Sequence, residues 1–125
     1  MAKKKLLVID DSETNLILIE SMFENDPRVE VLLRKNGKAI VEYCIKEMPD
    51  LILLDLMMPE INGFEVLSLF HLSQQLKDIP VIVISALEDQ ENIKNAIELG
   101  AIDYIIKPID YAENTRIILE KMGLN

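Results

Sequence analysis

Short apolar runs alternate with stretches of helical periodicity along the chain, and this alternation constrains the fold more than any other feature. Each run is followed by polar residues and then by apolar residues spaced three or four positions apart. Four of the runs are rich in Val, Ile or Leu with little alternation, which is typical of parallel strands covered by helices on both faces. The five predicted strands are residues 6–9, 29–33, 51–54, 81–84 and 102–106.

The second run differs from the others, because Val29, Glu30 and Val31 alternate between apolar and charged side chains. This pattern predicts a strand at an edge of the sheet. Helical crossovers between parallel strands are right-handed, so strand and helix units of this kind build an open, doubly wound α/β sandwich. We therefore expect a five-stranded parallel sheet with helices on both faces.

Capping residues predict where the helices begin and end. Asn36, Asn62 and Asp110 can each accept a hydrogen bond from the first turn of the helix that follows. Gly100 suits the left-handed position just past a helix end. The spacing of apolar residues predicts that three of the helices bury the following side chains: Ala39, Ile40, Tyr43 and Cys44 in the second, Ile93, Ala96 and Ile97 in the fourth, and Ile117 and Met122 in the fifth.

The composition excludes several classes of protein. Thirteen Lys and Arg residues against 22 Asp and Glu residues leave a net charge of −9, which argues against direct binding of nucleic acid or an anionic membrane. The chain has 125 residues, half of them hydrophobic, and this composition predicts one folded domain over residues 1–125. Its one cysteine, Cys44, cannot form an internal disulfide, which fits a reducing compartment such as the cytoplasm. No apolar stretch approaches the roughly 18 residues of a membrane span.

Polar side chains stand where the predicted strands end. Asp10 and Asp11 follow the first strand, Asp55 follows the third, Ser85 follows the fourth, and Lys107 follows the fifth. The carboxyl ends of parallel strands meet at one edge of the sheet, where ligands bind in folds of this class. We therefore expect three carboxylates, a hydroxyl and an ammonium to converge on one rim.

Three carboxylates on one rim require a positive counter-charge. Two of them about 4 Å apart repel by roughly 4 kcal/mol at an effective dielectric constant near 20. Lys107 supplies one positive charge, and carboxylate oxygens are ligands that Mg²⁺ prefers. No His or Cys stands at a strand end, which argues against zinc or copper. From these residues alone, a solvated acidic rim with Lys107 as an ordinary ion-pair partner stays open as the alternative.

The rim residues belong to four short motifs, each at a strand end. Acid pairs and Lys-Pro steps are common individually, but four motifs in this order and spacing are specific. They are Asp10-Asp11; Asp55-Leu56-Met57-Met58-Pro59 with Gly63 downstream; Ser85-Ala86; and Gly100-Ala101 followed by Tyr104 and Lys107-Pro108.

Together these motifs resemble the receiver domain of bacterial two-component response regulators, over residues 4–121. The resemblance implies a flavodoxin-like sheet with strand order 2-1-3-4-5 and five helices. It implies that Asp55 accepts a phosphoryl group from a phosphohistidine on a sensor histidine kinase or a histidine phosphotransfer protein. It also implies the remaining roles at the site: Asp10, Asp11, Asp55 and the Met57 backbone carbonyl as Mg²⁺ ligands, and Lys107 and Ser85 as partners of the phosphoryl oxygens.

The same resemblance implies a signalling switch rather than an enzyme. Ser85 moves toward the phosphoryl group, Tyr104 rotates inward, and a surface over residues 88–99, 101–106 and 110–122 changes shape to control an output protein or domain. Two questions stay open at this point. One is whether phosphorylation drives formation of a homodimer, and the other is whether the chain acts alone or within a larger regulator. The Lys107-Pro108 peptide bond is expected to be cis, since proline lowers the cost of that isomer to about 0.5 to 1 kcal/mol.

Two other functions compete with the phosphorylated switch. The first is an interaction module of the same fold that never accepts a phosphoryl group and shows no dependence on Mg²⁺. The second is a flavodoxin-type electron carrier, which shares the strand order. A flavin phosphate requires amide and hydroxyl donors at the start of the first helix, and the carboxylates of residues 10–13 would repel it.

Overall fold

A five-stranded parallel sheet forms the centre of the computed structural model, which describes residues 2–124. Its strand order is β2-β1-β3-β4-β5, and every neighbouring pair is parallel. The predicted order and the edge position of the second strand are therefore confirmed. The ends of the predicted domain, Met1 and Asn125, lie outside the described residues. The strands are β1 (Lys4–Ile9), β2 (Val29–Arg34), β3 (Leu51–Leu54), β4 (Val81–Ser85) and β5 (Asp103–Ile106).

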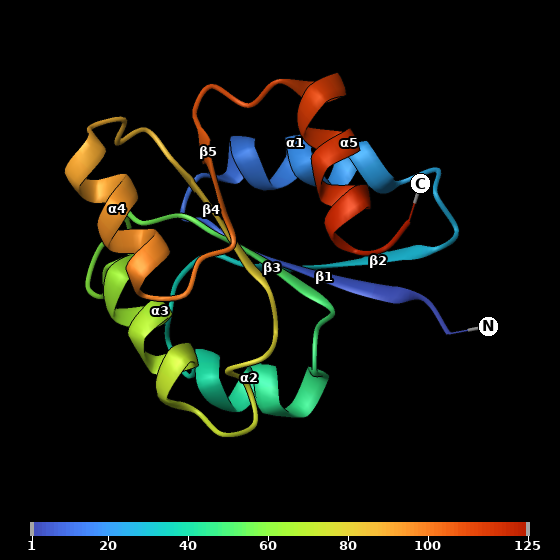
Figure 1. The fold of residues 1–125 in the computed structure, drawn as a ribbon. Helices are drawn as coiled ribbons and strands as arrows, with labels where there is room; N and C mark the ends of the chain where they lie inside the picture. Colours follow the sequence, from blue (N-terminus) through green and yellow to red (C-terminus); the bar gives the residue numbers. More distant parts are fainter. Residues whose placement is uncertain (1, 125) are drawn as a thin grey trace.

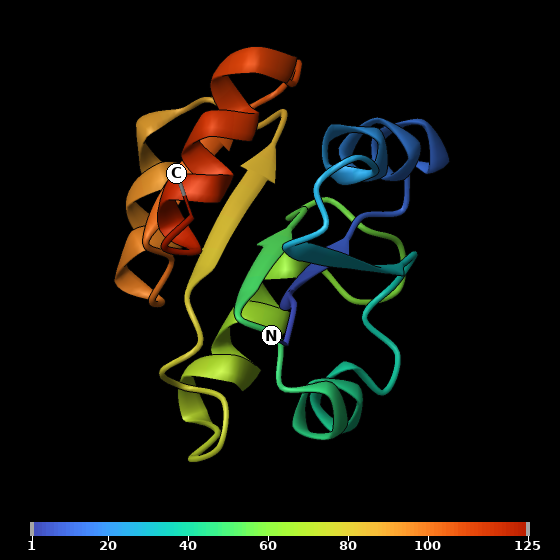
Figure 2. The same ribbon diagram turned by 90° about the vertical axis from the view of Figure 1, so that its right-hand side faces the viewer.

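Helices cover both faces of the sheet. Figure 1 shows α1 and α5 on one face and α2 and α3 on the other. In Figure 2, α4 and α5 lie toward the β5 end of the sheet, whereas α1 and α2 lie toward the β2 end. None of the helices in the described part of the chain combines the length and apolarity that a bilayer crossing requires. The helices are α1 (Glu13–Phe23), α2 (Ile40–Glu47), α3 (Gly63–Leu72), α4 (Gln90–Glu98) and α5 (Tyr111–Lys121).

The sheet separates two apolar clusters. Leu6 and Val8 of β1 pack toward α1 and α5, whereas Leu7 and Ile9 pack toward α2, α3 and α4. Alternate residues of a strand point to opposite faces, so a strand covered on both sides must be apolar throughout. All four residues of β3 and all five of β4 are buried for this reason. The continuous apolar runs of the sequence thus identify the central strands.

Two of the three predicted helix caps are confirmed. The side chain of Asn62 accepts a hydrogen bond from Glu65 N, and that of Asp110 accepts one from Glu113 N. The prediction for Asn36 is wrong, because its side chain accepts a hydrogen bond from Lys38 N at 2.9 Å and closes a turn before the helix. Helix α2 begins after Ala39, which adopts a left-handed φ of 52° and is exposed rather than buried.

The buried face of α4 is narrower than predicted, and the buried face of α5 is displaced along the helix. Ala96 is fully buried in α4, but Ile97 is 46% exposed. In α5, Ile118 is fully buried and Ile117 only partly, a displacement of one position from the prediction. Met122 is buried as predicted, and Gly100 has the expected left-handed φ of 108°.

Candidate functional site

The three predicted carboxylates come together at the carboxyl ends of β1 and β3. Ligand oxygens of Asp10, Asp11 and Asp55 all lie within 4.8 Å of one another. Asp10 and Asp55 are almost completely buried, whereas Asp11 is exposed to solvent. The predicted convergence of the carboxylates is confirmed, and their mixture of burial and exposure gives solvent access to a strongly negative site.

Asp55 is held rigidly by backbone bonds on both sides. Its N–H donates to the Ile9 carbonyl of β1 at 2.9 Å, which continues the sheet one residue beyond β3. Its Oδ1 accepts a hydrogen bond from Met57 N at 3.1 Å. Burial raises the pKa of the Asp55 carboxyl to about 6, and neighbouring Asp10 adds to that shift, while Met57 N and Lys107 oppose it. A charged Asp55 is therefore costly for this fold until a cation compensates it.

Lys107 provides one such cation and contacts both buried carboxylates. Its Nζ lies 3.2 Å from Asp10 Oδ2 and 3.3 Å from Asp55 Oδ2. Its backbone N–H donates to the Ser85 carbonyl at 2.8 Å, which fixes the start of this loop to the end of β4. The Lys107-Pro108 peptide bond is cis, as expected. The Lys107 ammonium thus pairs with two buried carboxylates, and the Asp11 carboxylate lies beside them.

Ser85 and Tyr104 meet at the Leu87 backbone. Ser85 is fully buried at the end of β4, and its Oγ accepts a hydrogen bond from Leu87 N at 3.2 Å. The Tyr104 hydroxyl donates to the Leu87 carbonyl at 2.6 Å. Burial raises the pKa of Tyr104, whose ring is half-buried, so the phenol stays protonated and keeps this donor. The two predicted switch residues are therefore joined through one residue of the β4–α4 loop.

The loop after Asp55 places two methionines in different environments. Met58 is buried in the core, and Met57 is 55% exposed beside the carboxylates. The loop returns to α3 where Gly63 N donates to the Leu56 carbonyl at 2.8 Å. This close approach of Gly63 to the backbone of residues 55 and 56 fixes the loop that carries Asp55. The assignment of the Met57 carbonyl as a metal ligand stays a prediction.

Two further groups at the site were not predicted from the sequence. Ser12 N donates to Asp10 Oδ1 at 2.9 Å, and Asn15 Nδ2 donates to Asp10 Oδ2 at 3.3 Å. They stabilise the Asp10 charge at the start of α1. Nothing in the sequence distinguishes Asn15 from other polar residues of the helix, so only the structure reveals its role.

Removing the shared cation is expected to destabilise the protein. The substitution Lys107→Met leaves two buried carboxylates without an ammonium, and because 19% of the lysine side chain is exposed we expect a loss of only about 2 kcal/mol. Urea unfolding in a magnesium-free buffer at neutral pH measures it. The control Lys94→Met removes an exposed lysine 3.9 Å from Glu98, for which we expect less than about 0.5 kcal/mol. Equal losses in the two variants would contradict a special role for Lys107 in balancing the cluster.

Comparison with protein families settles the class of the chain. The model of the response regulator receiver domain matches residues 6–119, which include Asp10, Asp55 and Lys107 of the site. The chain belongs to this family. The resemblance seen in the four sequence motifs is thereby confirmed.

Curated relatives of this receiver domain are longer proteins with different names. It is 35% identical over 111 residues to protein-glutamate methylesterase/protein-glutamine glutaminase 2 of Carboxydothermus hydrogenoformans, covering 86% of the chain and 30% of that protein. It is 35% identical over 106 residues to response regulator PleD of Caulobacter vibrioides, covering 85% of the chain and 23% of PleD. The chain therefore spans about a third or less of these relatives.

Solved structures show the same receiver fold. The response regulator domain of Thermotoga maritima CheB matches with a TM-score of 0.81 and 29% identity, over 98% of this chain and 95% of that one. A signal receiver domain from Colwellia psychrerythraea matches with a TM-score of 0.88 over 97% of this chain and 99% of that one, and its 21% identity supports the fold alone. The chain is thus a receiver domain of two-component signalling, a switch whose family is phosphorylated on aspartate and interacts with histidine kinases and output domains.

Proposed function

We propose that Asp55 is the phosphoacceptor of this receiver domain. The observation that carries the proposal is the position of its carboxylate, which is buried 3.3 Å from the Lys107 ammonium with two further carboxylates beside it. A carboxylate oxygen can attack the phosphorus of a phosphohistidine, and the imidazole leaves. Because phosphoryl transfer depends chiefly on positioning and charge neutralisation, a rigid and electrostatically strained carboxylate suits this role.

The donor set fits Mg²⁺. The three carboxylates and one ammonium together carry a net charge of −2, and oxygen ligands with solvent access suit an ion that keeps several waters. Asp10, Asp11 and Asp55 would hold the ion together with the Met57 carbonyl. When bound, Mg²⁺ would neutralise charge on the transferred group. Asp11 is exposed and therefore supplies the entry side of this metal site.

Two further side chains, those of Lys107 and Ser85, would contact the phosphoryl oxygens. Lys107 already contacts Asp55 and would follow the new negative charge. Ser85 would turn its hydroxyl from Leu87 N toward the phosphoryl group. Because Tyr104 bonds the Leu87 carbonyl, a shift of this loop would release the ring and let it rotate inward. This sequence of contacts links the state of Asp55 to α4 and β5.

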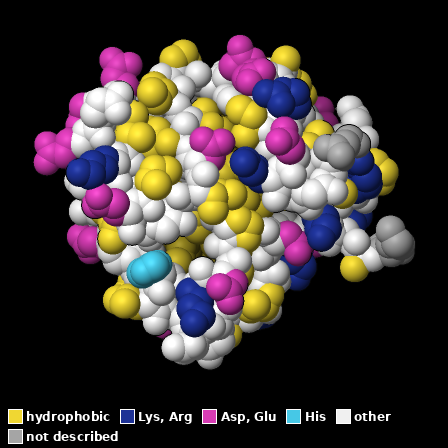
Figure 3. All heavy atoms as spheres, in the orientation of Figure 1, with side chains coloured by type: hydrophobic (Ala, Val, Ile, Leu, Met, Phe, Trp, Pro, Cys, Tyr) yellow, Lys and Arg dark blue, Asp and Glu magenta, His cyan; other side chains and the backbone are white. Residues whose placement is uncertain are grey.

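The output surface would consist of α4, β5 and α5. Exposed apolar side chains mark it, with Ile97, Ile102 and Ile106 each more than 40% exposed. Figure 3 shows hydrophobic side chains gathered over the middle of the face on which β5 lies. We infer that an output protein or domain binds here, that a homodimer formed on phosphorylation would use the same surface, and that a sensor histidine kinase or phosphotransfer protein supplies the phosphoryl group.

We also infer the setting in which the switch works. Cys44 is a free thiol in the core, and burial raises its pKa to about 12, so it is an inert apolar side chain. A free thiol and a kinase partner fit the cytoplasm. Residues 1–125 would act as one receiver unit without catalytic activity beyond self-catalysed phosphorylation and dephosphorylation.

Intact mass after incubation with acetyl phosphate tests the proposed function. We expect one phosphoryl adduct that requires Mg²⁺ and that peptide mapping assigns to Asp55. An adduct at another residue would contradict the phosphoacceptor assignment. No adduct, together with a melting temperature that Mg²⁺ does not change, would instead support an interaction module independent of phosphate.

The lifetime of the adduct depends on access of water to the phosphoryl group. Met57 and Leu87 stand two residues after Asp55 and Ser85, and both are apolar, so we expect slow self-dephosphorylation. Met57→Asn and Leu87→Glu would each bring a polar group that can orient water, and we expect the half-life of the adduct to shorten several-fold. Exposed Met48→Asn serves as the control. Unchanged half-lives in both variants would show that these positions do not limit hydrolysis.

A further inference from the structure

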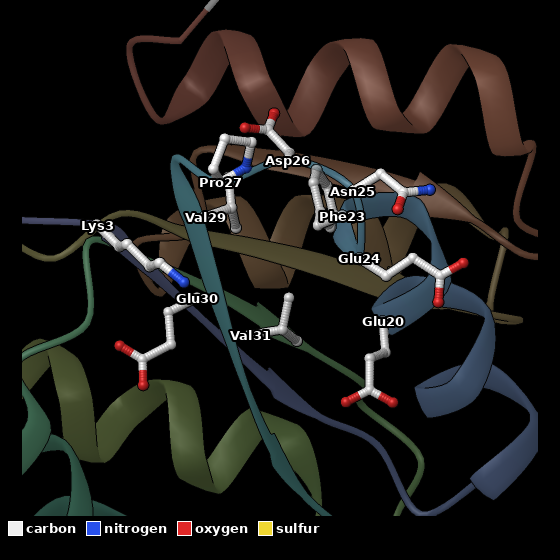
Figure 4. A pocket seen from close by; sticks show the side chains of 10 residues that line it. All are labelled: Lys3, Glu20, Phe23, Glu24, Asn25, Asp26, Pro27, Val29, Glu30 and Val31. Atoms are coloured by element: carbon white, nitrogen blue, oxygen red, sulfur yellow. The ribbon is translucent and has the colours of Figure 1, made fainter.

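The outer edge of β2 borders an open hollow at the end of the sheet opposite the carboxylate site. The hollow has a volume of about 580 Å³ and lies where β2 begins and α1 ends. Phe23 and Val29 form a buried apolar floor. Glu20, Glu24 and Glu30 are exposed at its rim (Figure 4).

The backbone of β2 has hydrogen-bonding groups that point away from the sheet. The carbonyls of Arg28 and Arg34 accept from Lys4 N at the start of β1 and from Asp10 N just after its end, so the even-numbered residues of β2 direct their backbone groups toward β1. Successive residues of a strand alternate in this respect, which turns Val31 and Leu33 outward. Within the described chain, β2 pairs with β1 alone. Val31 and Leu33 thus offer N–H and C=O groups for one more strand.

The charges around the hollow, at the start of β2, favour a cationic occupant. Figure 4 shows the side chains of Glu20 and Glu24 on the same side of β2 as Val31, and Glu30 on the other side. Asp26 is already neutralised by Arg28 at 2.8 Å, and Lys3 is the one cation among the residues that line the hollow in the described structure. Beside the hollow, both faces of an added strand would therefore meet carboxylates, whereas Arg34 and Lys35 follow Leu33 at the other end of β2.

We propose that the β2 edge and its hollow bind an extended peptide segment rich in lysine or arginine, which adds to the sheet as a sixth strand. The backbone of Val31 and Leu33 would hold the segment, and Glu20, Glu24 and Glu30 would select its charge. A second copy of this chain fits less well, because pairing two such edges would bring the two Glu30 rims together between molecules that each carry −9. The surface is separate from the α4, β5 and α5 output surface.

Fluorescence anisotropy with a short labelled peptide of alternating lysine and valine tests the proposal. We expect Glu20→Gln with Glu24→Gln to weaken binding about tenfold. The control pair Glu42→Gln with Glu88→Gln removes the same charge from exposed positions elsewhere, and we expect a change of less than about twofold. Equal weakening by both pairs would overturn the proposal in favour of non-specific attraction to an acidic protein.

Two further measurements examine the backbone contact. Bound peptide is expected to slow amide hydrogen exchange at Val31 and Leu33, and N-methylation of alternate peptide amides should abolish binding, since it removes the donors that pair with β2. A methylated peptide that binds as well as the parent would overturn strand addition.

Self-association of the chain through β2, seen by sedimentation, would show that a second copy of the chain, not a peptide, occupies this edge. None of these results depends on phosphorylation of Asp55, so they stand or fall separately from the proposed function.

Discussion

Replacing Asp55 by asparagine is expected to abolish the phosphoryl adduct and, in a magnesium-free buffer, to stabilise the protein. The amide lacks the nucleophilic carboxylate, so acetyl phosphate should leave the mass of Asp55→Asn unchanged. The stability gain arises because the carboxyl is only 3% exposed and shares its ammonium with Asp10. We expect the free energy of unfolding to rise by about 2 kcal/mol at neutral pH, as measured by urea unfolding.

The raised pKa of Asp55 also predicts how the stability of the protein depends on pH. Folding raises the pKa of Asp55 from 3.8 to about 6, chiefly through burial, so between these values the folded state binds the proton more tightly than the unfolded state. Asp55 should therefore contribute more stability to the native protein as the pH falls from about 7 toward about 4, and Asp55→Asn should lack this contribution. Exposed Asp78→Asn is the matched control, with an expected change within about 0.5 kcal/mol and a normal adduct. A variant that loses the adduct but also loses stability would contradict the view that Asp55 is held at an electrostatic cost.

Replacing Gly63 by alanine is expected to cost about 3 kcal/mol and to lower the melting temperature by roughly 10 °C. A Cβ at Gly63 would overlap the backbone carbonyl of Asp55 and would lie 2.5 Å from Leu56 Cα. Both obstacles are backbone atoms, so no side chain can rotate to make room. The loop that carries Asp55 must then shift, and we expect the adduct to form more slowly as well.

A second glycine separates steric overlap from backbone strain. Gly123 has a φ of 77°, and no atom of residues 2–124 is recorded within 4 Å of a Cβ built on it. Gly123→Ala should therefore cost only the left-handed backbone penalty of about 1 kcal/mol and should leave phosphorylation unchanged. Thermal unfolding and intact mass measure both variants. Similar losses for Gly63→Ala and Gly123→Ala would show that the contact with Asp55 and Leu56 is not the cause.

The sheet could be predicted from the sequence because burial on both faces leaves a direct pattern. Continuous apolar runs mark β3 and β4, and the alternation at Val29, Glu30 and Val31 marks the edge. The start of α2 could not be predicted in this way. Gly37 lies so close to Ile61 that a Cβ would be 2.7 Å from its Cγ2, and this tertiary contact shapes the turn before the helix. Local capping preference does not contain that information.

The candidate site could be predicted where it depends on topology alone. Parallel strands bring Asp10, Asp55 and Lys107 to one edge whatever the loops do, and the structure shows them in contact. The contacts of Asn15 and of the Leu87 carbonyl depend on loop and side-chain conformations that no spacing encodes. The family comparison identifies the class of the domain.

The length of β1 has a consequence for how the protein can change. The hollow begins where Lys4 pairs with Val29, and the carboxylate site begins just beyond Ile9 at the other end of the six-residue strand. At about 3.3 Å per residue the two regions lie roughly 20 Å apart. Substitutions more than about 10 Å apart with no shared partner usually combine additively. Substitutions of residues around the hollow, such as Glu20 and Glu24, and substitutions of the carboxylates should therefore show no epistasis, so selection could alter the charge of the hollow without disturbing the chemistry at the other end.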